Sequence, residues 1–129
     1  MQKGDKFNLT FTVSPAIHQG FITLFNDKNP LHTNNSFAIN KGFESEVMHG
    51  NILSGFVSCF VGEHLPIKNV IIQTQEMKFF KPVYLNDELF FEAEITEKFE
   101  SVNTVEIKFI FKKAPSLKVA SGKLNIGII

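Results

Sequence analysis

The chain has 129 residues, of which 43% are hydrophobic, and its 13 basic residues balance its 13 acidic ones. This length and composition predict one globular domain over residues 1–129 and exclude a disordered chain. The formal net charge of zero excludes a field that would draw the whole chain to nucleic acid or to an anionic membrane.

The first half of the chain predicts one strand and one capped helix. Apolar and polar residues alternate from Phe7 to Val13, as they do in a strand with one buried face. Ser14 and Pro15 then suit the N-cap and first position of a helix that ends near Asn26. The expected buried stripe of this helix consists of Ile17, Phe21 and Leu24. A loop follows it, with a short helical turn over residues 36–39.

Residues 50–62 predict a central helix with two different sides. The apolar side consists of Ile52, Leu53, Phe56, Val57, Phe60 and Val61. The other side carries the small residues Ser54, Gly55, Ser58, Cys59 and Gly62. Because no residue of this segment is charged, we expect a helix that is enclosed on both sides and wrapped by a sheet.

The second half of the chain predicts four antiparallel strands. The first is the long run 70–80, and apolar residues alternate with polar ones over residues 89–96 and 105–112. The last strand changes phase, since its apolar residues are first odd-numbered and then even-numbered. This change predicts a β-bulge at Ser121-Gly122. The pattern as a whole predicts an α+β domain with an antiparallel sheet curled round one helix.

The loop "FNDKNPLHTNNSFA", residues 25–38, carries more chemistry than a connection requires. Pro30 limits the freedom of the loop, so Asp27 and His32 could be held toward one point. Asp27 alone could equally be a turn residue, and His32 alone could be a structural histidine. His49 is expected to be structural and to form a hydrogen bond to this loop.

Three segments resemble, in order, the MaoC-like (R)-specific enoyl-CoA hydratases, a family with the hotdog fold. They are "FITLFNDKNPLHTNNSFA", "VMHGNILSGFVS" and "MKFFKPVYLNDEL". The resemblance implies a single hotdog domain in which Asp27 and His32 are catalytic and the Gly50 N–H forms an oxyanion hole. The expected substrate-binding residues are Phe25, Asn29, His49, Ile52, Phe56 and Ser58, the last at a position where the family often has a serine.

The family resemblance implies an enzyme that interconverts trans-2-enoyl and (R)-3-hydroxyacyl thioesters of coenzyme A or acyl carrier protein. No cofactor is expected, and the four histidines and one cysteine lack the spacing of a metal site. Phe25-Asn26 stands where the family has a small residue and glycine, so Phe25 could narrow the acyl site. Asn26 could keep the turn, because asparagine tolerates positive φ. Asn34 stands where an aspartate is common.

Several alternatives and partners remain to be tested. A non-catalytic hotdog subunit that binds an acyl chain or a protein partner is one alternative, and an acyl thioesterase is another. Curled sheets leave edges that pairing removes, so we expect a homodimer with a continuous ten-stranded sheet. A cytoplasmic protein without nucleic-acid or membrane contact is expected, because Cys59 is the single cysteine and no signal segment is present. Four lysines are either solvated or meet phosphates: Lys78, Lys81, Lys112 and Lys113.

Overall fold

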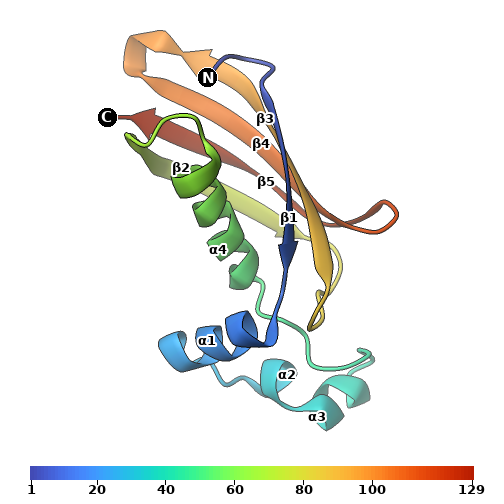
Figure 1. The fold of residues 1–129 in the computed structure, drawn as a ribbon. Helices are drawn as coiled ribbons and strands as arrows, with labels where there is room; N and C mark the ends of the chain where they lie inside the picture. The colour runs from blue at the N-terminus through green and yellow to red at the C-terminus, as the bar shows by residue number, and fades with distance from the viewer.

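A five-stranded antiparallel sheet curls along one side of a central helix in the computed structural model, which describes residues 1–129 (Figure 1). The strands are β1 (Lys6–Thr12), β2 (Val70–Phe79), β3 (Glu88–Phe99), β4 (Thr104–Lys113) and β5 (Leu117–Ile128), in the spatial order β1-β3-β4-β5-β2. The helices are α1 (Pro15–Phe25), α2 (Pro30–Thr33), α3 (Asn35–Asn40) and α4 (Asn51–Cys59), with a π-helical turn η1 (Phe60–His64) and a 3-10 turn η2 (Glu100–Val102). The predicted α+β architecture is confirmed.

The core forms between the apolar side of α4 and the inner face of the sheet. The alternating residues of β3 and β4 are buried as predicted: Leu89, Phe91, Ala93, Ile95, Val105, Ile107, Phe109 and Phe111. Phenylalanine rings join the two layers, since Phe60 lies 5.0 Å from Phe91 between ring centroids. Phe56 stacks on Phe11 of β1 at 4.6 Å. Large aromatic side chains supply much of the buried apolar area, and these contacts anchor the second half of α4 and η1 against the sheet.

The predicted buried stripe of α1 is wrong. No residue of α1 is buried, and the Leu24 side chain is 79% exposed. Figure 1 shows the reason: α1, α2 and α3 gather at one end of the domain, so α1 has no sheet to cover it. The helix itself is as expected, with Ser14 as its N-cap and Asn26 as its C-cap.

The small side of α4 also differs from the prediction. Gly55, Ser58, Cys59 and Gly62 are exposed in the single chain, whereas the sequence predicted enclosure on both sides. The sheet covers only the apolar side of the helix. An uncharged and exposed helix side therefore remains beside β2, which is an edge strand of the sheet.

The predicted β-bulge in the last strand lies two residues earlier than expected. Phe111 pairs with Ala120 and Lys112 pairs with Lys118, so Val119 is the extra residue. Gly122 serves a different purpose: a Cβ atom there would overlap the Glu76 carbonyl oxygen of β2. The glycine thus allows the close approach of two strands. None of the helices combines the length and apolar character that a membrane crossing requires.

Candidate active site

The turn that carries Asp27 is built by two asparagines. Asn26 ends α1 in the left-handed conformation, with φ 56°, as its residue type predicts. Asn29 then begins α2, because its side-chain Oδ1 accepts the Leu31 N–H at 2.9 Å. The sequence predicted a loop at His32, whereas the structure places His32 on this short helix. Its ring is placed by the helical backbone that Asn29 and Pro30 start.

Asp27 combines the turn chemistry of its residue type with an exposed position at the site. Its Oδ1 accepts the Asn29 N–H at 3.3 Å, so the turn role that the sequence left open is present. Its Oδ2 lies 3.8 Å from Nε2 of His49, and the side chain is 48% exposed. One nitrogen of His32, one of His49 and a carboxylate oxygen of Asp27 lie within 4.8 Å of one another. The fold thus brings the two predicted catalytic side chains together.

The hydrogen bonds of His32 set its tautomer. Its Nδ1 lies 2.7 Å from the Val47 carbonyl oxygen, which can only accept a hydrogen bond. Nδ1 therefore carries the hydrogen, and the neutral ring keeps a lone pair on Nε2. On the other side, Nε2 of His18 donates to the His32 carbonyl at 3.0 Å. His32 is held in the form that can take up a proton at Nε2.

His49 forms the predicted hydrogen bond to the loop. Its side chain is buried, and its Nε2 donates to the Asp27 carbonyl at 3.0 Å. Its ring stacks on the ring of His32, with centroids 3.9 Å apart, and Phe21 covers it at 4.5 Å. The Nδ1 atom is buried without a partner, which typically costs about 1–3 kcal/mol. Burial lowers the pKa of His49 below 6.5, so the ring is neutral at neutral pH.

The same three side chains offer metal-binding groups, but their arrangement fits a metal ion poorly. The rings of His32 and His49 are stacked with an interplanar angle of 28°, so their nitrogen lone pairs run side by side and do not converge. Carbonyl oxygens already occupy Nδ1 of His32 and Nε2 of His49. This donor set supports proton transfer better than tetrahedral ligation.

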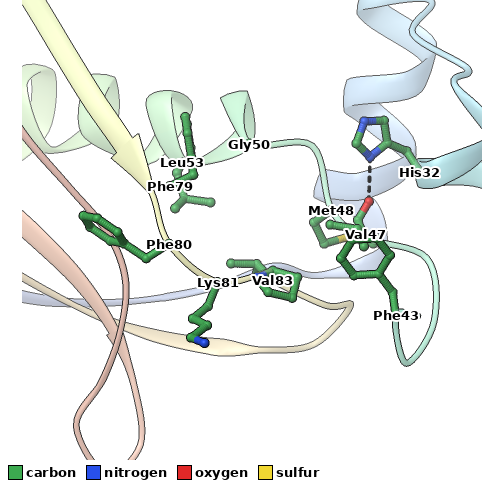
Figure 2. A pocket seen from close by; sticks show the side chains of 11 residues that line it. His32, Phe43, Val47, Met48, Gly50, Leu53, Phe79, Phe80, Lys81 and Val83 are labelled. Carbon is green, nitrogen blue, oxygen red and sulfur yellow. Dashed lines mark hydrogen bonds between the residues drawn. The ribbon is translucent and has the colours of Figure 1, made fainter. Parts of the chain in front are cut away.

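The two candidate catalytic side chains line two separate cavities. The His32 cavity has a volume of about 350 Å³. Figure 2 shows that His32, Gly50 and the end of β2 line it. Its other lining residues are Phe43, Val47, Met48, Leu53, Phe79, Phe80, Lys81, Pro82 and Val83. The α1–α4 cavity has a volume of about 910 Å³, and its lining includes Phe25, Asp27, Ile52 and Phe56. Asp27 and His32 thus face different cavities.

Of the predicted site residues on α4 and at its start, Gly50 lines the His32 cavity and Ser58 does not. Gly50 is the N-cap of α4, and its N–H donates to no group of the chain. A Cβ atom at this position would lie 3.0 Å from the Phe79 ring. A residue larger than glycine would therefore require this ring to shift. Ser58 is exposed on the small side of α4 and lines neither cavity, so its substrate contact stays a prediction. The same holds for Asn29, whose side chain caps α2.

Comparison with known proteins places the chain in a family. The model of the MaoC-like domain matches residues 2–111. The chain belongs to the MaoC-like domain family. An (R)-specific enoyl-CoA hydratase of Aeromonas caviae is 34% identical over 96 residues, which cover 74% of this MaoC-like chain and 72% of the relative. A mitochondrial 3-hydroxyacyl-[acyl-carrier-protein] dehydratase of Arabidopsis thaliana is 27% identical over 126 residues, or 95% and 75% of the two chains.

The solved structures agree with this assignment. The (R)-hydratase of A. caviae involved in PHA biosynthesis superposes with a TM-score of 0.91 and 27% identity. The match covers 100% of the MaoC-like chain and 98% of the hydratase. The fold of the MaoC-like chain is therefore the hotdog fold that its sequence segments predicted.

Sequence reasoning missed most of the His32 cavity. Its lining comes from the segment before α4, from α4 itself and from the end of β2, which lie far apart in the sequence. Neither strand alternation nor helix periodicity indicates that Phe43 and Phe79 face one space. His18 was also missed, because only the fold brings it to the His32 carbonyl.

Proposed function

We propose that this MaoC-like chain is a lyase that interconverts trans-2-enoyl and (R)-3-hydroxyacyl thioesters by adding and removing water. The observation that carries this proposal is the convergence of Asp27 and His32, with the free N–H of Gly50 in the cavity that His32 lines. The names of the hydratase and dehydratase relatives support the same reaction.

Hydration requires three groups, and we assign each of them to a part of this site. Asp27 and Nε2 of His32 hold one water between them and take one of its protons as the water oxygen attacks C3 of the enoyl group. The pair returns one proton to C2, so it ends in its starting state. The thioester oxygen gains negative charge in between, and the Gly50 N–H at the start of α4 donates to it. Loss of such a donor typically raises the barrier by about 3 kcal/mol.

The substrate extends in two directions from its reacting carbons, and each of the two cavities can hold one part of it. We assign the acyl chain to the α1–α4 cavity, which is the larger of these two apolar cavities, and the carrier arm to the His32 cavity. Lys81 lines the His32 cavity and takes part in no ion pair of the chain, so it can meet a phosphate. Lys112 and Lys113 pair with Glu92 and Asp87. Both coenzyme A and acyl carrier protein present such an arm.

Phe25 should limit the length of the acyl chain. Its ring lies at the α1–α4 cavity, 4.8 Å from the ring of Phe21. Phe25→Ser removes this bulk, so the ratio of kcat/KM for an eight-carbon over a four-carbon enoyl thioester should rise by about tenfold. Phe99→Ser is the control, since Phe99 is an exposed phenylalanine at the end of β3 and lines neither cavity. An unchanged chain-length profile in Phe25→Ser would count against this assignment.

We propose a homodimer in which β2 pairs with its copy into a ten-stranded sheet. β2 is an edge strand without a buried residue, and its Gln75 donates a hydrogen bond to Ser54 on the small side of α4. Leu24 and Phe25 of α1 add exposed apolar area, and both line the α1–α4 cavity. A second copy would cover these surfaces and close the site. Sedimentation at micromolar concentration should give a dimer, and a monomer would contradict this arrangement.

The domain organisation and compartment are proposals as well. Residues 1–129 should act as one domain, because β1 pairs with β3 and a single core joins both halves of the chain. The free thiol of Cys59 is exposed, which suits the reducing cytoplasm.

An absorbance assay tests the proposed reaction. A trans-2-enoyl thioester such as crotonyl-CoA should lose its conjugated absorbance when the chain is added, and the product should be the (R)-3-hydroxyacyl thioester. Release of free thiol would instead indicate a thioesterase. Binding of acyl thioester without turnover would indicate a non-catalytic subunit.

A further inference from the structure

We infer that His49 is a positioning residue that holds Asp27, His32 and Gly50 in register for the reaction. This inference rests on the proposed function and deepens it. His49 need not touch the substrate for this purpose, because it acts through the three groups that do.

His49 is connected to Asp27, His32 and Gly50 in three different ways. Its Nε2 donates to the backbone carbonyl of Asp27 at 3.0 Å, which ties the turn to the start of α4. Its ring forms one wall against the ring of His32, whose other restraint is the Val47 carbonyl. The next residue in the chain is Gly50, so the same backbone carries the oxyanion donor. His49 therefore fixes the positions of Asp27, His32 and the Gly50 N–H relative to one another.

The tie to Asp27 matters because little else holds that residue. Asp27 is exposed and follows a left-handed asparagine, and its side chain is bonded only to the Asn29 N–H of its own turn. No other side chain donates to the Asp27 carbonyl. A displacement of about 1 Å in such a group can lower a rate about 10²-fold. Leu31 and His32 are bound to Val47, but the hydrogen bond from His49 is the contact that ties Asp27 itself to the segment before α4.

The burial of His49 argues that the residue serves the site more than the stability of the fold. Its Nδ1 is buried without a partner, a defect that an aromatic hydrocarbon ring of similar size would not have. The Asp27 carbonyl belongs to an exposed residue, so water could replace the donor without loss of the fold. Burial lowers the pKa of His49, which keeps a positive charge away from His32 at neutral pH.

Two substitutions separate the ring from its hydrogen bond. His49→Phe keeps a stacked aromatic ring but removes the donor, and His49→Gln places an amide N–H near the position of Nε2. In His49→Phe we expect kcat to fall about 10- to 100-fold, with KM changed less than about twofold and Tm not lowered. His49→Gln should recover most of kcat. The control is His64→Phe, since His64 is an exposed histidine at the end of η1.

A double substitution and an activity-independent measurement complete the test. If His49 acts through Asp27, His49→Phe should cost less than about twofold in kcat when Asp27→Asn is already present. Hydrogen exchange of the backbone amides at residues 26–33 should be faster in His49→Phe than in the wild type and close to wild type in His49→Gln.

The outcomes distinguish this inference from the proposed function. The positioning role is overturned if amide exchange at residues 26–33 is unchanged in His49→Phe, or if folded His49→Gln is as slow as His49→Phe. It is also overturned if His49→Phe keeps wild-type kcat. A wild-type chain that hydrates no enoyl thioester overturns the proposed function, and the exchange measurement still decides whether His49 holds the turn.

Discussion

Asp27→Asn is expected to lower kcat for enoyl-thioester hydration by about 10²- to 10⁴-fold. The substitution keeps the size of the side chain and the oxygen that accepts the Asn29 N–H, so the turn should survive. It removes the negative charge and the proton-accepting oxygen that faces the histidines. KM should change little, because the carrier arm binds in the His32 cavity, which Asp27 does not line, and the amide keeps the shape of the α1–α4 cavity that holds the acyl chain.

His32→Ala should lower kcat by a similar factor, and the two losses should not add. Asp27 and His32 hold one water as a unit, so the double variant should be scarcely slower than the slower single variant. Thermal stability should be retained in all three variants, since both side chains lie outside the buried core. Steady-state kinetics and thermal unfolding measure both expectations. Wild-type hydration by Asp27→Asn, or fully additive losses, would contradict the assigned roles.

Gly122→Ala should destabilise the fold by roughly 3 kcal/mol and lower Tm by about 10 °C. The added Cβ atom would overlap the Glu76 carbonyl oxygen of β2 and would lie 2.5 Å from the Phe109 ring. Backbone atoms in the middle of a paired sheet cannot move aside cheaply, so β2 and β5 would have to separate. Thermal unfolding of the purified variant measures the loss.

A glycine in open space provides the matched control for Gly122. No atom lies within 4 Å of a Cβ built at Gly20 in α1, and alanine is the better helix former by about 1 kcal/mol. Gly20→Ala should therefore keep or slightly raise Tm. Equal Tm values for the two variants would show that strand contact at Gly122 does not limit stability.

The sequence predicted those parts of the fold in which one residue pattern meets one environment. Alternation over β3 and β4 predicted their buried faces, because residues 89–95 and 105–111 of these strands have one face on the core. The Ser14 N-cap predicted the start of α1, and the left-handed Asn26 lies where the helix was expected to end, because helix ends depend on local residues. Local chemistry was sufficient in these segments.

The sequence failed where the environment depends on segments far away in the chain. Leu24 has the spacing of a buried residue, but the sheet does not extend as far as α1. The same limit applies to the small side of α4, which the fold of one chain leaves open. The phase change in β5 was recognised, but its position depends on how Phe111 and Lys112 pair across the sheet.

In the candidate site, too, the sequence predicted what depends on local residues and missed what depends on distant segments. Motif spacing predicted that Asp27 and His32 come together, whereas their separation between two cavities follows from the packing of α1, α4 and β2. The tautomer of His32 depends on the Val47 carbonyl, which no residue pattern identifies because every residue has a carbonyl. Such backbone contacts decide which nitrogen can take a proton.

Hydration of crotonyl-CoA, followed by its absorbance with wild-type chain and with Asp27→Asn side by side, tests the central claim most directly. The account predicts that wild-type chain removes the conjugated absorbance and forms the (R)-3-hydroxy product, while Asp27→Asn is slower by at least about 10²-fold. Equal rates for the two proteins, or no hydration of this or a longer enoyl thioester by the wild type, would contradict it.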